Sequence, residues 1–414
     1  MSLPRYAEYK DSGVPWLGEV PEHWTIAPFK RLVKFQNGSD HKAIEVDDGY
    51  PVYGSGGVFA YASEYLNDGE SVLLGRKGTV DKPLYVTGKF WTVDTMYWTR
   101  IAPDAYGKFC YYAATAIPFA YYSTNTALPS MTQNALGAHS MAFPEKEEQI
   151  EIAAFLDRET GKIDALIAEQ EKLLKLLAEK RQATISHAVT RGLNPNAPMK
   201  DSGVPWMGEV PAHWTIAKLG HFATVENGTT PSRIVEDYWQ GGDVPWLASG
   251  EVNQVFIDES SEFITKMALE RCSLRLLPVG TVVVGMIGQG KTRGMAALLR
   301  IPATINQNLA AICPDKKVLG EYVLYVLHAV YEWLREAGRG GNQAAMNCEM
   351  LSALRIPMPP IEEQKEIVAF IEIEVGKLDS LRFAGEHAID LLKERRSALI
   401  AAAVTGKVDV RLAA

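Results

Sequence analysis

Residues 285–292 have the types and spacing that could bind a nucleotide. They fit the pattern G-x-x-x-x-G-K-T, and the apolar run VVVG ends at the first glycine. In nucleotide-binding proteins the backbone amides of this loop hold the phosphates, the lysine reaches the outer phosphates, and the threonine hydroxyl binds Mg²⁺. One hypothesis is therefore a P-loop NTPase that uses Gly285 to Thr292.

The residues after this loop favour a different structure. A phosphate-binding loop opens a helix, because the N-terminal amides of that helix hold the phosphates. Here Gly294 follows at once, and Pro302 would end any helix within about two turns. The segment instead predicts a β-hairpin with a glycine-rich basic tip. Residues 69–80, GESVLLGRKGTV, repeat the apolar run and basic loop without fitting the nucleotide pattern.

Loops of this kind are suited to DNA. Arginine and lysine can contact phosphates or the O6 and N7 atoms of guanine, glutamine can read adenine, and glycine lets the backbone approach closely. The alternative is a solvated hairpin tip that binds nothing. The predicted DNA-contacting residues are Arg76, Lys77, Thr79, Gln289, Lys291, Thr292 and Arg293.

The elements that must position these loops occur twice in the chain. KDSGVPWLGEVPEHWTIA (residues 10–27) returns at residues 200–217 with two differences in eighteen positions. EEQIEIAAFLDRETGKIDAL (residues 147–166) matches residues 362–381, so the offset grows from 190 to 215 residues. The intervening region is thus about 25 residues longer in the second half. The chain consists of two homologous halves, each with a signature, a variable region and a helix.

The repeated P-x-x-x-E-E-Q segments predict helix starts, because Pro144 and Pro359 suit a first turn and the acids suit the positive end of the helix dipole. Apolar residues then recur at steps of three and four, typical of a coiled coil with defects. Each helix should span roughly 40 residues, or about 60 Å. It could pack on its own domain, but antiparallel pairing is favoured. The predicted pairing residues are Ile152, Leu156, Ile163, Leu166, Leu173, Leu177, Ile367, Ile371, Leu378, Leu381 and Leu392.

Short apolar runs broken by Gly, Pro, Asn and Asp predict many-looped α/β domains in the variable regions. The expected fold class is mixed α/β, with two such domains in a pseudo-two-fold arrangement, separated by two long antiparallel helices that form a coiled coil. The stretch around residues 196–203 is the expected linker into the second half.

Composition bounds the chemistry. The chain has 414 residues, a net charge of −8 and four scattered cysteines, which predicts a reduced, cytoplasmic protein without structural zinc. No apolar run reaches the roughly 18–20 residues that would cross a bilayer, so no membrane partner is expected. The acidic balance argues mildly against DNA binding by the chain alone, unless partners or local basic loops supply positive charge.

Catalytic motifs are missing from the sequence. There is no D/N-P-P-Y/F of adenine methyltransferases, no Pro-Asp with a following Glu-x-Lys of nucleases, and no H-E-x-x-H or G-x-S-x-G. No catalytic residue and no metal site are predicted. His23 and His213, in the signature, are interpreted as structural. The signature tryptophans are expected to anchor the segment in a groove: Trp16, Trp24, Trp206 and Trp214.

These features together resemble the specificity (S) subunit of type I restriction-modification systems. The resemblance rests on the repeated KDSGVPW-x-GEVP-x-HW signature and the two P-x-x-x-EEQ-x-EI-x-AF helices. It also rests on YPVYGSGGVFAY…LLGRKGT…FWTVDTMYW in the first variable region and GDVPWLASGEV…GQGKTRGM…INQNLAAI in the second. These motifs span nearly the whole chain in the family's order.

The resemblance implies a non-catalytic subunit whose two target recognition domains each read half of a split, asymmetric sequence in double-stranded DNA. The paired helices would set the gap and dock two methyltransferase (M) subunits, which restriction (R) subunits join. This chain would bind no cofactor itself, whereas S-adenosylmethionine would be bound by M, and ATP and Mg by R.

The chain would accordingly divide into five parts. These are a first recognition domain (residues 1–142), a first spacer helix (143–192), a linker with the second recognition domain (193–357), a second spacer helix (358–406) and a tail (407–414). Three alternatives stay open. They are the specificity subunit of a related type II system, the P-loop NTPase, and a coiled-coil scaffold with no role in DNA binding.

Overall fold

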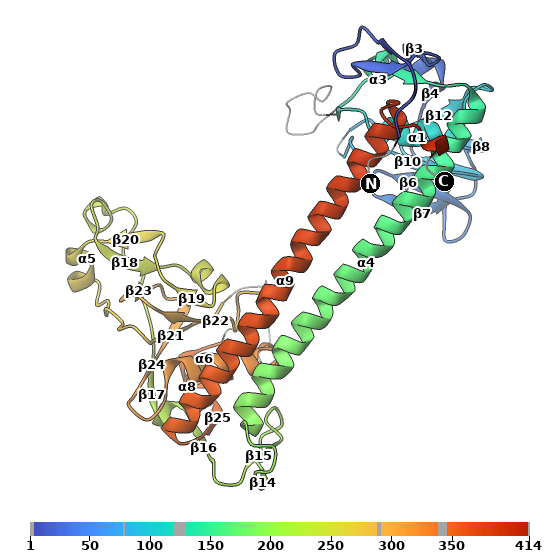
Figure 1. Cartoon of the computed structure of the whole chain (residues 1–414). Helices are drawn as coiled ribbons and strands as arrows, with labels where there is room; N and C mark the ends of the chain where they lie inside the picture. The colour runs from blue at the N-terminus through green and yellow to red at the C-terminus, as the bar shows by residue number, and fades with distance from the viewer. Residues whose placement is uncertain (1–3, 78, 120–129, 288–290, 338–345, 413–414) are drawn as a thin grey trace. The chain divides into compact units, whose positions relative to one another are not determined.

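The computed structural model describes residues 4–77, 79–119, 130–287, 291–337 and 346–412 (Figure 1). The chain forms two compact units. Unit 1 combines Met1–Glu171 with Glu386–Ala414, and unit 2 is Lys172–Gly385. Two long helices, α4 (Lys146–Arg191) and α9 (Ile361–Val404), contribute residues to both units. None of the helices in the described ranges is long and apolar enough to cross a membrane.

Unit 1 contains two main sheets and a small helical layer. An antiparallel sheet has the order β10-β9-β12-β4, with β4 (Val33–Asn37), β9 (Ser71–Gly75), β10 (Leu84–Val86) and β12 (Met96–Ile101). A second sheet has the order β5-β7-β6-β11-β8, with β5 (Glu45–Val46), β6 (Tyr50–Gly54), β7 (Gly57–Ala62), β8 (Asn67–Asp68) and β11 (Lys89–Thr92). The remaining elements are β1 (Tyr9–Asp11), β2 (Glu19–Pro21), β3 (Thr25–Pro28), α1 (Gly107–Thr115), α3 (Gln133–Ala138) and β13 (Ser140–Phe143).

Unit 2 repeats this plan. Its larger sheet has the order β17-β24-β21-β22-β19, with β17 (Ala223–Asn227), β19 (Phe256–Ile257), β21 (Val282–Gly285), β22 (Ala296–Leu299) and β24 (Leu309–Pro314). The smaller sheet is β20-β18-β23, with β18 (Val244–Leu247), β20 (Glu262–Ile264) and β23 (Thr304–Ile305). The remaining elements are β14 (Met199–Asp201), β15 (Glu209–Pro211), β16 (Thr215–Lys218), α5 (Lys266–Arg271), α6 (Gly320–Ala329), α7 (Tyr331–Ala337), α8 (Cys348–Ala353) and β25 (Arg355–Met358).

The run VVVG forms a central strand because both of its faces are covered. Val282 and Val284 are buried in the same cluster as α6, whereas Val283 is buried in a separate cluster with Leu247. β21 pairs antiparallel with β22, which confirms the predicted hairpin arrangement of this region.

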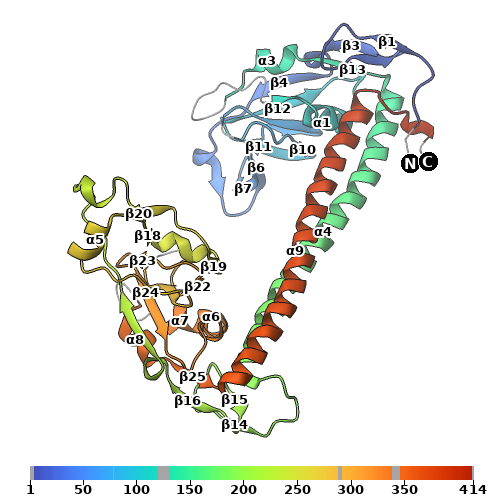
Figure 2. The same ribbon diagram turned by 60° about the vertical axis from the view of Figure 1, so that its left-hand side comes forward.

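The two long helices pair in an antiparallel manner within each unit (Figure 2). In unit 1 the C-terminal part of α9 is buried with the N-terminal part of α4, and Arg396 Nε donates to Asp164 Oδ1 at 2.8 Å. In unit 2 the C-terminal part of α4 is buried with the N-terminal part of α9, and Arg181 lies 3.6 Å from Asp379. Each unit thus contains the N-terminal part of one long helix and the C-terminal part of the other.

The buried seam of this pair departs from the predicted stripe at three leucines. Seven of the predicted pairing residues are buried and Leu392 is half-buried, but Leu166, Leu173 and Leu381 are 53%, 43% and 56% exposed. The prediction is wrong for these three. The predicted stripe continues from Ile163 to Leu166, three residues on. In the structure the inward face of α4 continues from Ile163 to Ile167, four residues on, and then to Leu174 and Leu177; Ile167 and Leu174 are half-buried and Leu177 is buried. The seam therefore accepts the polar, half-buried Gln170.

The signature tryptophans anchor each helix start through a glutamate. Trp24 is fully buried and its indole Nε1 donates to Glu148 Oε1 at 3.1 Å, near the start of α4. His23 Nε2 lies 2.8 Å from the other oxygen of Glu148, which is a structural contact. In unit 2, Trp214 and His213 contact Glu363 in the same way, at 3.0 and 2.9 Å.

The structure differs from three expectations, which concern Trp16, the linker and the C-terminal tail. Trp16 is 39% exposed and stacks on His139, so it is not a buried anchor. The expected linker around residues 196–203 contains strand β14, which pairs with β15. The expected tail also belongs to unit 1, because Val410 is buried and Lys407 Nζ donates to the Leu17 carbonyl at 2.8 Å.

Candidate nucleic-acid interface

Each unit has one edge where strands from both of its sheets end or begin. In unit 1 four strands end there and β12 begins there, at Asn37, Gly54, Gly75, Thr92 and Met96. In unit 2 four strands end there and β24 begins there, at Asn227, Leu247, Gly285, Ile305 and Leu309. We call this the strand-end edge. The predicted basic loops follow β9 and β21, so they emerge from it.

Backbone hydrogen bonds show that the strand-end edge is built twice, residue for residue. Three N–H to carbonyl bonds of unit 1 are Ser39 to Thr92 (2.9 Å), Val93 to Tyr53 (3.2 Å) and Arg76 to Thr95 (2.8 Å). Their counterparts in unit 2 are Thr229 to Ile305 (3.0 Å), Asn306 to Leu247 (3.0 Å) and Met286 to Asn308 (2.9 Å). The matching bonds make Arg76 equivalent to Met286, and Asp94 equivalent to Gln307.

A glycine permits the tight turn in both units. Gly38 and Gly228 follow β4 and β17, and a Cβ atom at either position would overlap the carbonyl of Val93 or Ile305. The next residue is supported by an indole in each case, because Trp91 Nε1 donates to the Ser39 carbonyl at 2.8 Å and Trp246 Nε1 donates to the Thr229 carbonyl at 3.1 Å. The repeated Asn-Gly-Ser/Thr sequence is a signal of this edge that could be read from the sequence.

The basic loop of unit 1 is partly tied to the edge. Arg76 is half-buried, and its Nη1 atom donates to the Asp94 carbonyl at 3.3 Å. Lys77 and Thr79 are exposed beside it. Two of the three predicted residues are therefore accessible, and the third holds the turn between β11 and β12 in place.

The loop of unit 2 separates two residues that the sequence grouped together. The Lys291 carbonyl accepts a hydrogen bond from the Tyr331 hydroxyl at 2.6 Å, while its side chain is exposed. Arg293 is half-buried, and its Nη2 atom donates to the Arg335 carbonyl at 3.0 Å. This contact attaches the loop to α7, which is not the outward orientation expected of a base-reading arginine. Thr292 is half-buried, and Gln289 lies outside the described residues.

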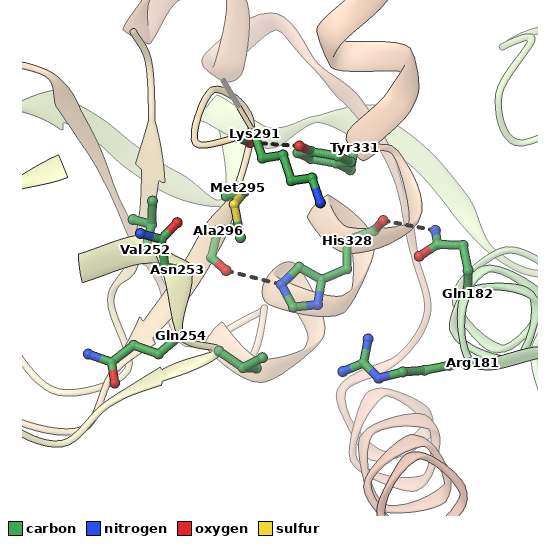
Figure 3. A pocket seen from close by; sticks show the side chains of 11 residues that line it. Arg181, Gln182, Val252, Asn253, Gln254, Lys291, Met295, Ala296, His328 and Tyr331 are labelled. Atoms are coloured by element: carbon green, nitrogen blue, oxygen red, sulfur yellow. Dashed lines mark hydrogen bonds between the residues drawn. The ribbon is translucent and has the colours of Figure 1, made fainter. Parts of the chain in front are cut away.

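Lys291 reaches a pocket of about 290 Å³ between the loop, α6, α7 and α4 (Figure 3). His328 lines this pocket and its Nε2 atom lies 3.0 Å from the Ala296 carbonyl. Burial lowers the pKa of His328, so the ring is neutral near pH 7. The positive charge of the pocket therefore comes from Lys291 and from Arg181, which is paired with Asp379.

The surroundings of this loop do not fit a nucleotide site. The element after Thr292 is strand β22 and not the helix whose N-terminus would hold phosphates. Among the described residues, no group of three or more His, Cys, Asp or Glu side chains could hold a metal ion. The G-x-x-x-x-G-K-T spacing arises here from a hairpin in a sheet.

Comparison with known proteins identifies the family. The family model described as the type I restriction modification DNA specificity domain matches the chain twice, at residues 21–176 and 211–378. The chain belongs to this family. It is a type I restriction-modification specificity subunit with two tandem target recognition domains, a DNA-recognition protein without catalytic function.

Individual relatives agree with this assignment. The specificity subunit is 26% identical over 409 residues to the type I restriction enzyme EcoR124I/EcoR124II specificity subunit of Escherichia coli, covering 92% of this chain and 91% of that protein. It is 29% identical over 170 residues to the MjaIX specificity subunit of Methanocaldococcus jannaschii, covering 40% and 38% of the two chains.

A solved structure has a similar fold. It concerns complex assembly and conformational transition of the type I restriction-modification system, and one of its chains superposes with a TM-score of 0.66. The two chains are 16% identical, over 93% of the specificity subunit and 98% of that chain.

Sequence patterns assign no role to Asp94, Gln307 and Thr230 of this specificity subunit, although they lie on the strand-end edge. Asp94 and Gln307 occur in the runs FWTVDTMYW and INQNLAAI, which share almost no residues. Their equivalence follows from backbone hydrogen bonds, which a comparison of side chains does not reveal.

Proposed function

We propose that this specificity subunit reads a split, asymmetric DNA target, with each unit contacting one half-site through its strand-end edge. The observation that carries the proposal is the duplicated edge, in which one backbone framework holds different side chains in the two units. Contacts to DNA phosphates and sugars position a protein on the duplex, and contacts of its side chains to base edges specify the sequence. Two different sets of side chains therefore read two different half-sites.

The paired helices would set the gap between half-sites. α4 has 46 residues and α9 has 44, without a break. At 1.5 Å per residue these lengths are about 69 and 66 Å, or roughly two turns of B-DNA. The two recognition domains at residues 1–142 and 193–357 and the two spacer helices at residues 143–192 and 358–406 belong to this proposal, whereas residues 407–414 are part of unit 1.

Exposed leucines on the helices form the candidate docking site for the two M subunits. In unit 1 these are Leu166 of α4 and Leu391 of α9, and in unit 2 they are Leu381 of α9 and Leu176 of α4. Leu166 corresponds to Leu381, and Leu176 to Leu391, at the repeat offset of 215 residues. Exposed apolar side chains that together form a contiguous patch mark protein contacts. Each unit thus presents an equivalent pair, one for each M copy.

The partners supply what this chain lacks. S-adenosylmethionine would be bound by the M subunits, and ATP with Mg by the R subunits. The M subunits would also enclose the DNA, which accounts for recognition by a chain whose net charge is −8.

Exchanging residues 28–142 for those of another specificity subunit tests the proposal. Co-expression with M, followed by sequencing of methylated bases in the host genome, should show one changed half-site. The other half-site and the gap should stay the same, because unit 2 and the helices are untouched. The complementary exchange of residues 218–354 should change only the other half-site. If neither exchange alters either half-site, the proposed function is wrong.

Lys77→Ala and Lys291→Ala should weaken DNA binding by the M–S complex to a similar degree on all sequences. Each exposed lysine near the strand-end edge is expected to contact a phosphate. The slope of log K against the logarithm of the salt concentration should therefore become smaller in magnitude by about one for each lysine removed. Binding titrations at several salt concentrations measure this slope. Tight binding of Mg-ATP to the isolated chain, lost in Lys291→Ala, would instead support the nucleotide hypothesis.

A further inference from the structure

We propose that Asp94 and Gln307 are equivalent specificity-determining residues that contact bases of opposite hydrogen-bonding character. Asp94 would accept a hydrogen bond from the amino group of cytosine or adenine. Gln307 would donate one to the keto oxygen of guanine or thymine. This inference rests on the proposed function, because it requires the strand-end edge to face DNA bases.

The two residues occupy one position of the duplicated edge. Strand register makes Tyr97 the partner of Asn37 in unit 1 and Ala310 the partner of Asn227 in unit 2. Counting back three residues from Tyr97 and from Ala310 leads to Asp94 and Gln307. Both side chains are exposed in the turn between two strands of the edge. The turn is closed in each unit by a matching bond, from Met96 N to the Val93 carbonyl and from Leu309 N to the Asn306 carbonyl.

The carboxylate of Asp94 can only accept hydrogen bonds when it is ionised. Within the described ranges this carboxylate has no hydrogen-bond or ion-pair partner, whereas the Asp94 backbone carbonyl accepts a hydrogen bond from Arg76. A carboxylate facing DNA is repelled by phosphates. The favourable partners in the major groove are the N4 amino group of cytosine and the N6 amino group of adenine. The guanidinium of Arg76 beside it reduces the repulsion.

The amide of Gln307 is oriented by a neighbouring hydroxyl. Thr230 Oγ1 donates to Gln307 Oε1 at 2.5 Å, which leaves the amide NH₂ group to donate outward. Thr230 is itself positioned by the preceding bond from Thr229 N to the Ile305 carbonyl. In the major groove an oriented donor can bond to the O6 atom of guanine, the O4 atom of thymine or the N7 atom of a purine, and it finds no acceptor on cytosine. The same backbone position therefore presents an acceptor in unit 1 and a donor in unit 2.

The test uses isosteric exchanges in the M–S complex: Asp94→Asn, Gln307→Glu and Thr230→Val. Competition binding against duplexes that vary one base pair at a time measures discrimination, and sequencing of methylated bases confirms it in cells. Asp94→Asn should change the preferred base at one position of one half-site, and Gln307→Glu at one position of the other half-site. The expected change in discrimination is about 5- to 150-fold. Thr230→Val should weaken discrimination at the Gln307 position alone.

Matched controls are Asp68→Asn and Gln240→Glu, which make the same chemical changes at exposed sites. In the pairing of β8 with β11, Asp68 lies opposite Lys89, which is at the end of β11 away from the strand-end edge. Gln240 precedes β18, whose other end lies on the edge. Both controls should leave every base preference unchanged.

Two results would overturn the inference. One is an unchanged target in Asp94→Asn and Gln307→Glu while the exchange of residues 28–142 still alters a half-site, which leaves the proposed function intact. The other is an equal loss of binding on all duplexes, which would make these residues supports of the turn. If the domain exchange itself has no effect, the proposed function fails, and this result is distinguishable from the first two.

Discussion

Trp24→Ala should lower the melting temperature of unit 1 by roughly 6–20 °C. The indole is fully buried between β2 and the end of α9, and it donates to Glu148. Truncating a buried tryptophan costs about 3–5 kcal/mol of unfolding free energy. In a unit of this size each kcal/mol shifts the melting temperature by about 2–4 °C. Calorimetry, with hydrogen exchange to assign the transition to unit 1, measures the effect.

Trp16→Ala is the matched control from the same signature. Trp16 is partly exposed and contacts the buried His139 by stacking, with 4.6 Å between ring centroids. Losing that contact should cost about 1 kcal/mol. Equal losses of stability in Trp16→Ala and Trp24→Ala would contradict the anchoring role of Trp24. Trp214→Ala should destabilise unit 2 as Trp24→Ala destabilises unit 1.

The double variant Leu176→Glu/Leu381→Glu should remove one M subunit from the complex. Both leucines are about half exposed, so glutamate is tolerated in the free chain. A carboxylate in an apolar protein contact loses at least about 2 kcal/mol of binding free energy, which is roughly 30-fold in affinity. Native mass spectrometry should show one M subunit per chain where the unaltered chain binds two.

Ala178→Glu provides the same charge change on an exposed position of α4, two residues from Leu176. It should leave the stoichiometry unchanged, because residues two apart on a helix do not share a face. Loss of an M subunit in Ala178→Glu, or two M subunits in the double variant, would contradict docking through the leucines. Leu166→Glu/Leu391→Glu should act in the same way in unit 1.

Periodic and repeated features were predictable from sequence for local reasons. Both long helices begin two residues after Pro144 and Pro359, because proline and the following acids suit a helix N-terminus. The hairpin of β21 and β22 followed from an apolar run interrupted by glycines. The seam between the helices was harder to predict. Leu166 has the right residue type, but the partner helix determines that Ile167 is half-buried while Leu166 stays exposed.

In the candidate site, too, some features follow from local sequence and others depend on tertiary packing. The sequence identified exposed basic residues such as Lys77 and Lys291, because glycine-rich loops after strands leave such side chains accessible. It did not show that Arg293 would bond to the end of α7. That contact joins residues 42 positions apart. It depends on packing that no local pattern encodes.

Two homologous halves, two long helices and a basic hairpin in each half can be predicted from the chain alone, since repeats, periodicity and turn residues act over short distances along it. The set of side chains that share the strand-end edge depends on the folded arrangement. Asp94 and Gln307 reach equivalent positions through hydrogen bonds among strands that are distant in sequence. The spacing of those strands differs between the halves, so their equivalence appears only once the chain has folded.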